Sequence, residues 1–288
     1  MNFPNYFADA ESNFDDAEFV IFGVPYDKTS SFRFGASKAP REIRQASWNF
    51  ETFNIRSGFD LREAKFHDYG DLDIKDKTPE GMIKRVRRFV SEILLKDKFP
   101  IAIGGEHSIT PGVVQAFSKD ISVVSLDAHI DFRQEYENSP YSHACSSRRI
   151  VDHIGIKNIV VLGIRSAEKE EFIDAKKLGL FYIDVFEIKK NGIEEALARA
   201  RGYLRNKKIY LTLDIDVLDP SFAPGISTPE PFGLDPFDIV KCIEAFSSKL
   251  IGFDVVEVCP PYDNGQTALL AAKYIRYVIE HVISRNKR

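Results

Sequence analysis

Two segments of this chain place acidic and histidine side chains at alternate positions after an apolar run. Segment 125–131 reads Ser-Leu-Asp-Ala-His-Ile-Asp, and segment 211–216 reads Leu-Thr-Leu-Asp-Ile-Asp. In an extended strand, side chains at every second position point to the same side. We therefore expect these polar side chains to converge where each strand ends. They are Asp127, His129 and Asp131 in the first segment, and Asp214 and Asp216 in the second.

Carboxylates that share a small buried space need a counter-charge. Two close carboxylates repel each other, and an unpaired buried charge is costly. A divalent cation removes both penalties. Together with a histidine from a neighbouring motif, the candidate metal ligands are His107, Asp127, His129, Asp131, Asp214 and Asp216. This mixture of nitrogen and oxygen ligands suits Mn²⁺, Fe²⁺ or Co²⁺. Two such ions roughly 3.5–4 Å apart would lower the pKa of a bridging water to near neutrality.

Short apolar runs alternate with helical patterns along most of the chain. The apolar runs predict strands at 19–24, 99–103, 121–126, 159–164, 179–183, 209–215 and 250–258. Helical spacing predicts one helix that begins near residue 40, and further helices at 79–95, 109–117, 142–153, 167–177, 193–204, 236–247 and 267–283. Residues 68–72 are predicted to form a turn-rich connection. The alternation predicts an α/β fold, a three-layer α/β/α arrangement around a central, mostly parallel sheet. No repeat or linker divides it, so we expect a single domain over residues 1–288.

The candidate functional groups all follow expected strand ends. His107 follows the strand at 99–103, Asp127 follows the next strand, and Glu257 ends the last one. Ligands of parallel α/β sheets bind beyond the carboxyl ends of the strands. A lone histidine near a strand end is more often structural, but here each histidine has carboxylate neighbours. The sequence therefore predicts one functional site at one edge of the sheet.

Composition sets limits on the partners. The chain has 288 residues and a formal net charge of -4, which gives no bulk electrostatic case for nucleic acid or an anionic membrane. No apolar run approaches the roughly 20 residues that cross a bilayer. The N-terminal residues lack the pattern of a signal peptide, and three scattered cysteines do not make a disulfide framework. We expect a soluble, cytoplasmic protein with neither a nucleic-acid nor a membrane partner.

Three motifs resemble the metal signatures of the ureohydrolases, the family of arginase, agmatinase, guanidinobutyrase and formimidoylglutamase. They are Gly-Gly-Glu-His-Ser at 104–108, Ser-Leu-Asp-Ala-His-Ile-Asp at 125–131 and Asp-Ile-Asp-Val-Leu-Asp-Pro at 214–220. Within that family, segments 132–136, 141–145 and 223–231 look most like the substrate loops of the agmatinases. The resemblance spans most of the chain and implies an arginase-type fold.

The resemblance also implies a role for each site residue. His107 and Asp131 would bind one metal, His129 and Asp216 the other, and Asp127 and Asp214 would bridge the two. His143 would relay a proton to the leaving amine, and Glu257 would accept the guanidinium of the substrate. A guanidinium presents paired N–H donors that a carboxylate can meet with both oxygens. The implied cofactor is two divalent ions, with Mn²⁺ expected first and Fe²⁺ as the alternative. The implied assembly is a homo-oligomer, a trimer or a hexamer.

The expected activity is metal-dependent hydrolysis of agmatine to putrescine and urea by a metal-bridging hydroxide. Arginine must also have its α-carboxylate bound, and Glu135 and Glu137 in the loop 134–140 would repel that group if they faced inward. The alternatives are arginase or guanidinobutyrase activity, or a non-catalytic homologue that keeps the fold for binding or assembly. A non-catalytic homologue should have lost a metal ligand or the glutamate, and this sequence keeps a suitable residue at every proposed position.

Several residues depart from the family pattern or leave two interpretations open. Glu106 stands where the ureohydrolases usually have Asp, Ile226 and Ser227 replace Thr-Gly, and Phe232 replaces Gly. The last three could reshape either the pocket wall or a subunit contact. Asp219 looks like a turn residue rather than a seventh ligand. Cys145 and Cys259 are either small buried side chains or thiols that make activity sensitive to oxidation.

Overall fold

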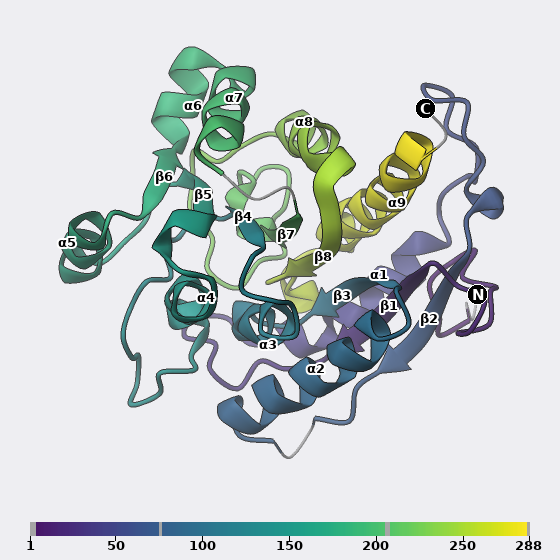
Figure 1. Ribbon diagram of the computed structural model, residues 1–288, viewed down its shortest axis with the longest axis horizontal. Coiled ribbons are helices and arrows are strands. Elements are labelled where there is room, and N and C mark those ends of the chain that lie inside the picture. The colour runs from purple at the N-terminus through teal and green to yellow at the C-terminus, as the bar shows by residue number, and fades with distance from the viewer. Residues whose placement is uncertain (1–3, 75–76, 205–207, 287–288) are drawn as a thin grey trace.

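A computed structural model describes residues 4–74, 77–204 and 208–286. Within these ranges, eight strands form one sheet in the order β2-β1-β3-β8-β7-β4-β5-β6, and every pair is parallel. The strands are β1 (Phe19–Val24), β2 (Phe66–Asp71), β3 (Phe99–Gly104), β4 (Ser122–Leu126), β5 (Ile159–Ile164), β6 (Phe181–Asp184), β7 (Ile209–Asp214) and β8 (Leu250–Val256). Helices cover both faces (Figure 1), which confirms the predicted α/β/α layers.

Alternate residues of each central strand belong to two separate hydrophobic cores. In β1, Phe19 and Ile21 pack on one face of the sheet, and Val20 and Phe22 on the other. The first core is covered by α1 (Ala39–Ser47), α6 (Val185–Asn191), α7 (Ile193–Tyr203), α8 (Pro236–Phe246) and α9 (Gln266–Asn286). The second is covered by α2 (Pro79–Leu94), α3 (Thr110–Val114), α4 (Ser146–Ile154) and α5 (Lys169–Leu178). Burial on both faces explains why these strands read as continuous apolar runs.

The structure differs from the sequence-based prediction at two elements. The segment expected to be a turn-rich connection is the edge strand β2, which pairs with β1. Its polar residues have partners, since Asp68 accepts a 2.7 Å hydrogen bond from the buried guanidinium of Arg44. Helix α6 was not predicted. It begins directly after β6, where Asp184 caps it by accepting a hydrogen bond from the N–H of Glu187.

The strand order brings four carboxyl ends together at the centre of the sheet. Strands β3, β8, β7 and β4 are consecutive neighbours, and each of them leads directly into one of the predicted site segments. The predicted edge of the sheet is therefore one continuous site. No helix in the described part of the chain is long and apolar enough to span a bilayer.

Candidate metal centre and substrate pocket

The predicted ligands after β4 converge, but not through strand alternation. Strand β4 ends at Leu126, but pairing towards the β5 side continues as far as an isolated parallel bridge between His129 and Ser166. The extended path ends at Asp131, which lies in the left-handed region at φ 49°. Asp127 holds this turn by accepting a 2.7 Å hydrogen bond from the N–H of His129. Asp216 of the neighbouring segment accepts a second one, 3.1 Å long, from the N–H of Ala128. The side chains converge as predicted, whereas the predicted extended backbone does not continue through Asp131.

One group of predicted ligands surrounds His107. Its Nδ1 atom lies 3.1 Å from Asp127 Oδ2, 3.3 Å from Asp131 Oδ2 and 3.2 Å from Asp214 Oδ2. All four side chains are buried. Ligand atoms about 2.1 Å from one ion and at right angles to each other are roughly 3 Å apart, so these separations match the edges of a coordination shell.

A second group surrounds His129 and shares a carboxylate with the first. His129 Nδ1 lies 2.9 Å from Asp216 Oδ2 and 3.8 Å from Asp127 Oδ1. Asp127 thus contributes one oxygen to each group, and both groups have the geometry of a metal site. All six residues predicted as ligands lie in these two groups.

The hydrogen bonds of His107 test whether the site fits a metal. Its Nε2 lies 3.2 Å from the hydroxyl of Thr212, and that hydroxyl donates a 2.5 Å hydrogen bond to Asp254. Thr212 therefore accepts from Nε2–H, which leaves the lone pair of Nδ1 facing three carboxylates. Nδ1 and Asp127 Oδ2 are buried without a hydrogen-bond partner. Atoms with only lone pairs repel unless a cation lies between them, so the donor set fits a divalent metal.

The carboxylates in this site have strongly shifted pKa values. Burial raises the pKa of Asp127 to about 7, and the negative charge of Asp131 adds to the rise. Burial also raises the pKa of Asp214 well above its usual range. Burial acts in the same direction on Asp216, but the adjacent His129 holds the pKa of Asp216 at about 2. Metal uptake by this site therefore competes with protons.

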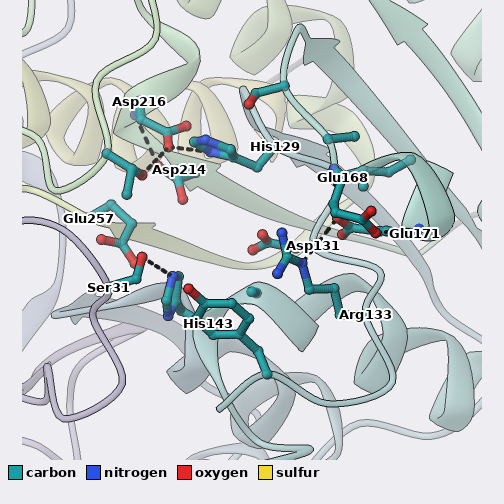
Figure 2. A pocket seen from close by; sticks show the side chains of 16 residues that line it. Ser31, His129, Asp131, Arg133, His143, Glu168, Glu171, Asp214, Asp216 and Glu257 are labelled. Atoms are coloured by element: carbon teal, nitrogen blue, oxygen red, sulfur yellow. Dashed lines mark hydrogen bonds and ion pairs between the residues drawn. The ribbon is translucent and has the colours of Figure 1, made fainter.

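A cavity of about 340 Å³ opens above these ligands (Figure 2). That volume suits a small organic molecule. Its walls include Asp131, His129, Asp214 and Asp216 from the metal groups, and His143 and Glu257 from two further segments. Arg133 is the one guanidinium among the described lining residues, and it lies 3.3 Å from the carboxylate of Glu171. The cavity is therefore acidic.

Glu257 occupies the position after β8 in a constrained conformation. Its φ is 65°, and its N–H donates a 2.7 Å hydrogen bond to the carbonyl of Gly105. Its Oε1 atom accepts a 2.6 Å hydrogen bond from the N–H of His107, which engages only one of the two carboxylate oxygens. The residue is 4% exposed, and burial raises the pKa of its carboxyl to about 7. A cationic ligand in the cavity would favour its ionised form.

His143 lies on the cavity wall without being a member of either metal group. It begins a short 3-10 turn, His143–Cys145, before α4. Its ring nitrogens lie near hydroxyls of another loop, with Nδ1 3.4 Å from Thr29 Oγ1 and Nε2 3.3 Å from Ser31 Oγ. Figure 2 shows His143 and Ser31 beside Glu257.

The loop 134–140 does not place its acidic residues in the cavity. Glu135 and Glu137 are exposed and are not among the lining residues, whereas Tyr136 is. The expected repulsion of a substrate carboxylate by those two residues therefore has no support in the structure. Two other carboxylates line the cavity, Glu168 and Glu171 at the start of α5. Sequence reasoning missed them because they read as an ordinary helix start.

Arg165 was also missed, and it supports the segment that carries Asp216. Its Nη2 donates a 2.7 Å hydrogen bond to the carbonyl of Asp216 and a 2.8 Å one to the carbonyl of Glu230. Its Nη1 donates to the carbonyl of Val217 at 3.2 Å. These contacts are all to main-chain oxygens, so the sequence carries no signal of them.

The residues that depart from the family pattern lie outside the cavity lining. Ile226 is fully buried and forms a β-bridge with Val258, and Ser227 is buried beside it. Phe232 is 72% exposed, with φ at 68°. Asp219 accepts hydrogen bonds from the N–H groups of Ser221 and Gly233, which agrees with a turn residue.

The two cysteines near the site are buried. Burial raises the pKa of the Cys145 thiol and of the Cys259 thiol to about 11. Both therefore stay neutral at physiological pH, and neutral thiols react slowly with oxidants. This favours the interpretation as small packed side chains.

Comparison with known proteins gives consistent matches. The chain matches the model of the arginase family over residues 17–280. It is 35% identical over 282 residues to an agmatinase of Bacillus cereus, covering 95% of this chain and 94% of the relative. It is 36% identical to the N(1)-aminopropylagmatine ureohydrolase of Thermococcus kodakarensis, covering 92% and 91%. The crystal structure of agmatine ureohydrolase of Thermoplasma volcanium superposes with a TM-score of 0.95 at 40% identity, covering 100% of this chain and 97% of the other.

Proposed function

Because this chain belongs to the arginase family, we propose that it is an agmatinase, which hydrolyses the guanidino group of agmatine to putrescine and urea. The observation that carries the proposal is one acidic cavity in which Glu257 lies beside two metal-binding groups that share Asp127. In such a cavity, the carboxylate of Glu257 can bind a guanidinium next to the metal-binding groups, which can supply a nucleophilic water.

We assign the metal ligands as the resemblance implies. His107 and Asp131 would hold one ion and His129 and Asp216 the other, with Asp127 and Asp214 serving both. The division into two groups around a common Asp127 supports the assignment of Asp127, whereas the sharing of Asp214 rests on the resemblance alone. When bound, the pair supplies a water of lowered pKa as nucleophile and a positive charge beside the reacting carbon. We propose Mn²⁺, with Fe²⁺ as the alternative, because both accept this ligand set.

Glu257 binds the guanidinium of the substrate. Its carboxylate is buried, lies on the cavity wall, and has one oxygen engaged by the N–H of His107. Charge-assisted hydrogen bonds from the guanidinium to this carboxylate neutralise both partners away from water. Since His107 is itself a ligand, the same contact fixes the guanidinium relative to the metal centre.

His143 donates a proton to the leaving nitrogen. An amine leaves carbon readily only when protonated, because an amide anion is too basic to depart. A positioned general acid is worth roughly 10²–10⁴-fold in rate. His143 lies on the cavity wall beside Glu257 and belongs to neither metal group, so neither of its ring nitrogens is needed as a metal ligand (Figure 2).

The far end of the cavity suits an amine. Glu168, Glu171 and Arg133 lie across the cavity from Glu257 (Figure 2). Arg133 is paired with Glu171, and Glu168 accepts hydrogen bonds from the N–H groups of Glu170 and Glu171, so this end of the cavity carries two carboxylates and one guanidinium. Agmatine carries an ammonium group at the end opposite its guanidinium, and arginine adds a carboxylate that the net negative charge of this end of the cavity disfavours.

The test is urea release from four guanidino compounds side by side: agmatine, arginine, guanidinobutyrate and N(1)-aminopropylagmatine. Urea from agmatine at the highest kcat/KM supports the proposal. Urea mainly from N(1)-aminopropylagmatine would favour the second candidate, which rests on the 36% identity to the Thermococcus kodakarensis protein of that name. Urea mainly from arginine or guanidinobutyrate would keep the chemistry and overturn the choice of substrate.

We also infer a single domain, a homo-oligomer of three or six chains, and a cytoplasmic role in putrescine biosynthesis. One sheet that takes strands from both halves of the chain supports the first. Exposed aromatic side chains, among them Phe32, Phe34 and Phe237, support an interface between copies. Sedimentation equilibrium of the metal-loaded protein measures the number of chains directly.

A further inference from the structure

Glu106 is a buried carboxylate that the proposed mechanism does not use. It is 0% exposed and accepts four hydrogen bonds. Its donors are Ser108 Oγ at 2.5 Å, Thr29 Oγ1 at 2.6 Å, Thr29 N at 2.7 Å and Ser30 Oγ at 3.4 Å. Three of these four donors come from one loop, 29–30, which is distant in sequence. Glu106 therefore ties that loop to the end of β3.

Thr29 continues this connection to His143. Its hydroxyl donates its one proton to Glu106, so towards His143 it can only accept. It accepts a 3.0 Å hydrogen bond from the N–H of His143 and lies 3.4 Å from ring atom Nδ1. Two residues further on, Ser31 Oγ lies 3.3 Å from Nε2 of the same ring. The loop that Glu106 holds thus contacts the main chain and both ring nitrogens of His143.

We propose that Glu106 is a positioning residue for His143, acting through Thr29 and the loop 29–31. The proposal rests on the proposed function, in which His143 is the proton donor. Glutamate is about 1.5 Å longer than aspartate along its side chain. That length lets the carboxylate reach both Ser108 on its own segment and Thr29 on the opposite loop. The departure at Glu106 from the ureohydrolase pattern is thereby explained by this chain's own contacts.

A competing explanation is that Glu106 only supports the metal ligand next to it in sequence, His107. The two explanations predict different effects on kcat when the loop residue Thr29 is substituted. Thr29 makes no contact with the metal groups, so a change there reaches the reaction either directly through His143 or through its hydrogen bond to Glu106. Ser108 offers the matched control, because its hydroxyl donates to the same Glu106 oxygen as Thr29 Oγ1 but is not bonded to His143.

The experiment uses the metal-loaded full-length enzyme and the variants Glu106→Gln, Thr29→Val, Thr29→Ser and Ser108→Ala. We expect Glu106→Gln and Thr29→Val to lower kcat for agmatine about 10- to 100-fold, which is a large part of the value of a general acid. KM and the bound metal per chain should stay at the wild-type values. The solvent deuterium isotope effect on kcat should rise, because proton transfer becomes slower. Thr29→Ser keeps the hydroxyl and should retain the wild-type kcat. The kcat of Ser108→Ala should also stay close to the wild-type value.

Two kinetic results would overturn the proposal: an unchanged kcat in Thr29→Val, or a loss of kcat that follows a loss of metal or a rise in KM. Thr29→Val keeps the test decisive if Glu106→Gln does not fold. Crystal structures of metal-loaded wild type and Thr29→Val give a readout that needs no activity. We expect the His143 ring to leave Ser31 in the variant, and an unmoved ring contradicts the inference. Absence of urea from wild type with every guanidino compound would instead refute the proposed function, while the ring position still decides the role of Glu106.

Discussion

Replacing Glu257 by Gln tests how the guanidinium is bound. The amide has the shape of the carboxylate, and its oxygen can still accept the hydrogen bond from the N–H of His107. The amide nitrogen then faces the cavity and presents N–H groups to the N–H groups of the guanidinium. The variant therefore removes a charge pair and adds a clash of donors, without emptying the space.

The expected loss follows from the burial of this pair. Glu257 is 4% exposed, so solvent screens it little. Removing one partner of a buried hydrogen-bonded charge pair costs about 2–5 kcal/mol. Since each 1.4 kcal/mol is a factor of ten, kcat/KM for agmatine should fall about 30- to 4000-fold.

The assay is initial-rate urea release, with bound metal measured on the same samples. Glu280→Gln is the matched control, since Glu280 is also buried but lies outside the cavity lining. Its kcat/KM should stay near wild type. A loss of kcat/KM smaller than about threefold in Glu257→Gln with full metal content would refute the reasoning, because removing one partner of a buried charge pair has a larger effect on binding free energy.

Three further predictions follow from the site. Thr212→Val removes the hydroxyl that orients the ligand imidazole and should weaken metal binding about 10- to 100-fold, whereas Thr212→Ser should retain it, as measured by competition with a chelator. In the metal-free protein, burial raises the pKa of Asp127 and of Glu257 to about 7, so the folded state binds protons more tightly than the unfolded chain. The free energy of unfolding of the metal-free protein should therefore fall as pH rises through about 7. Bound metal should raise the Tm more at about pH 8 than at about pH 6, and an equal rise at both pH values would contradict this. Activity should be the same with and without reductant, because burial keeps the thiols of Cys145 and Cys259 neutral.

The sequence predicted the place of the site better than its local geometry. The strand-end rule located His107, Asp127 and Glu257 at one edge, because each directly follows an apolar run that becomes a central strand. The path of residues 127–131 was predicted only in part, since pairing with the neighbouring segment continues to His129 but Asp131 adopts a left-handed backbone conformation. The side chains of Asp127 and Asp216 stabilise this path by accepting hydrogen bonds from the N–H groups of His129 and Ala128, which the spacing of polar residues does not reveal.

What the sequence did not predict depends on main-chain contacts or on residues with an ordinary local role. Strand β2 is at the sheet edge and polar, so it lacks the apolar run of the central strands. Glu168 caps α5, and that local role hid its place on the cavity wall. Arg165 binds carbonyl groups, which are the same in every residue. Nothing in the pattern marks Thr29 as a neighbour of His143.

The central claim, guanidine hydrolysis by a two-metal site, is tested most directly by titrating metal-free protein with Mn²⁺ and measuring urea and putrescine from agmatine at each step. The account predicts equal amounts of the two products, with activity that reaches its maximum when two ions are bound per chain. Full activity with one ion, or none when two ions are bound, would contradict it.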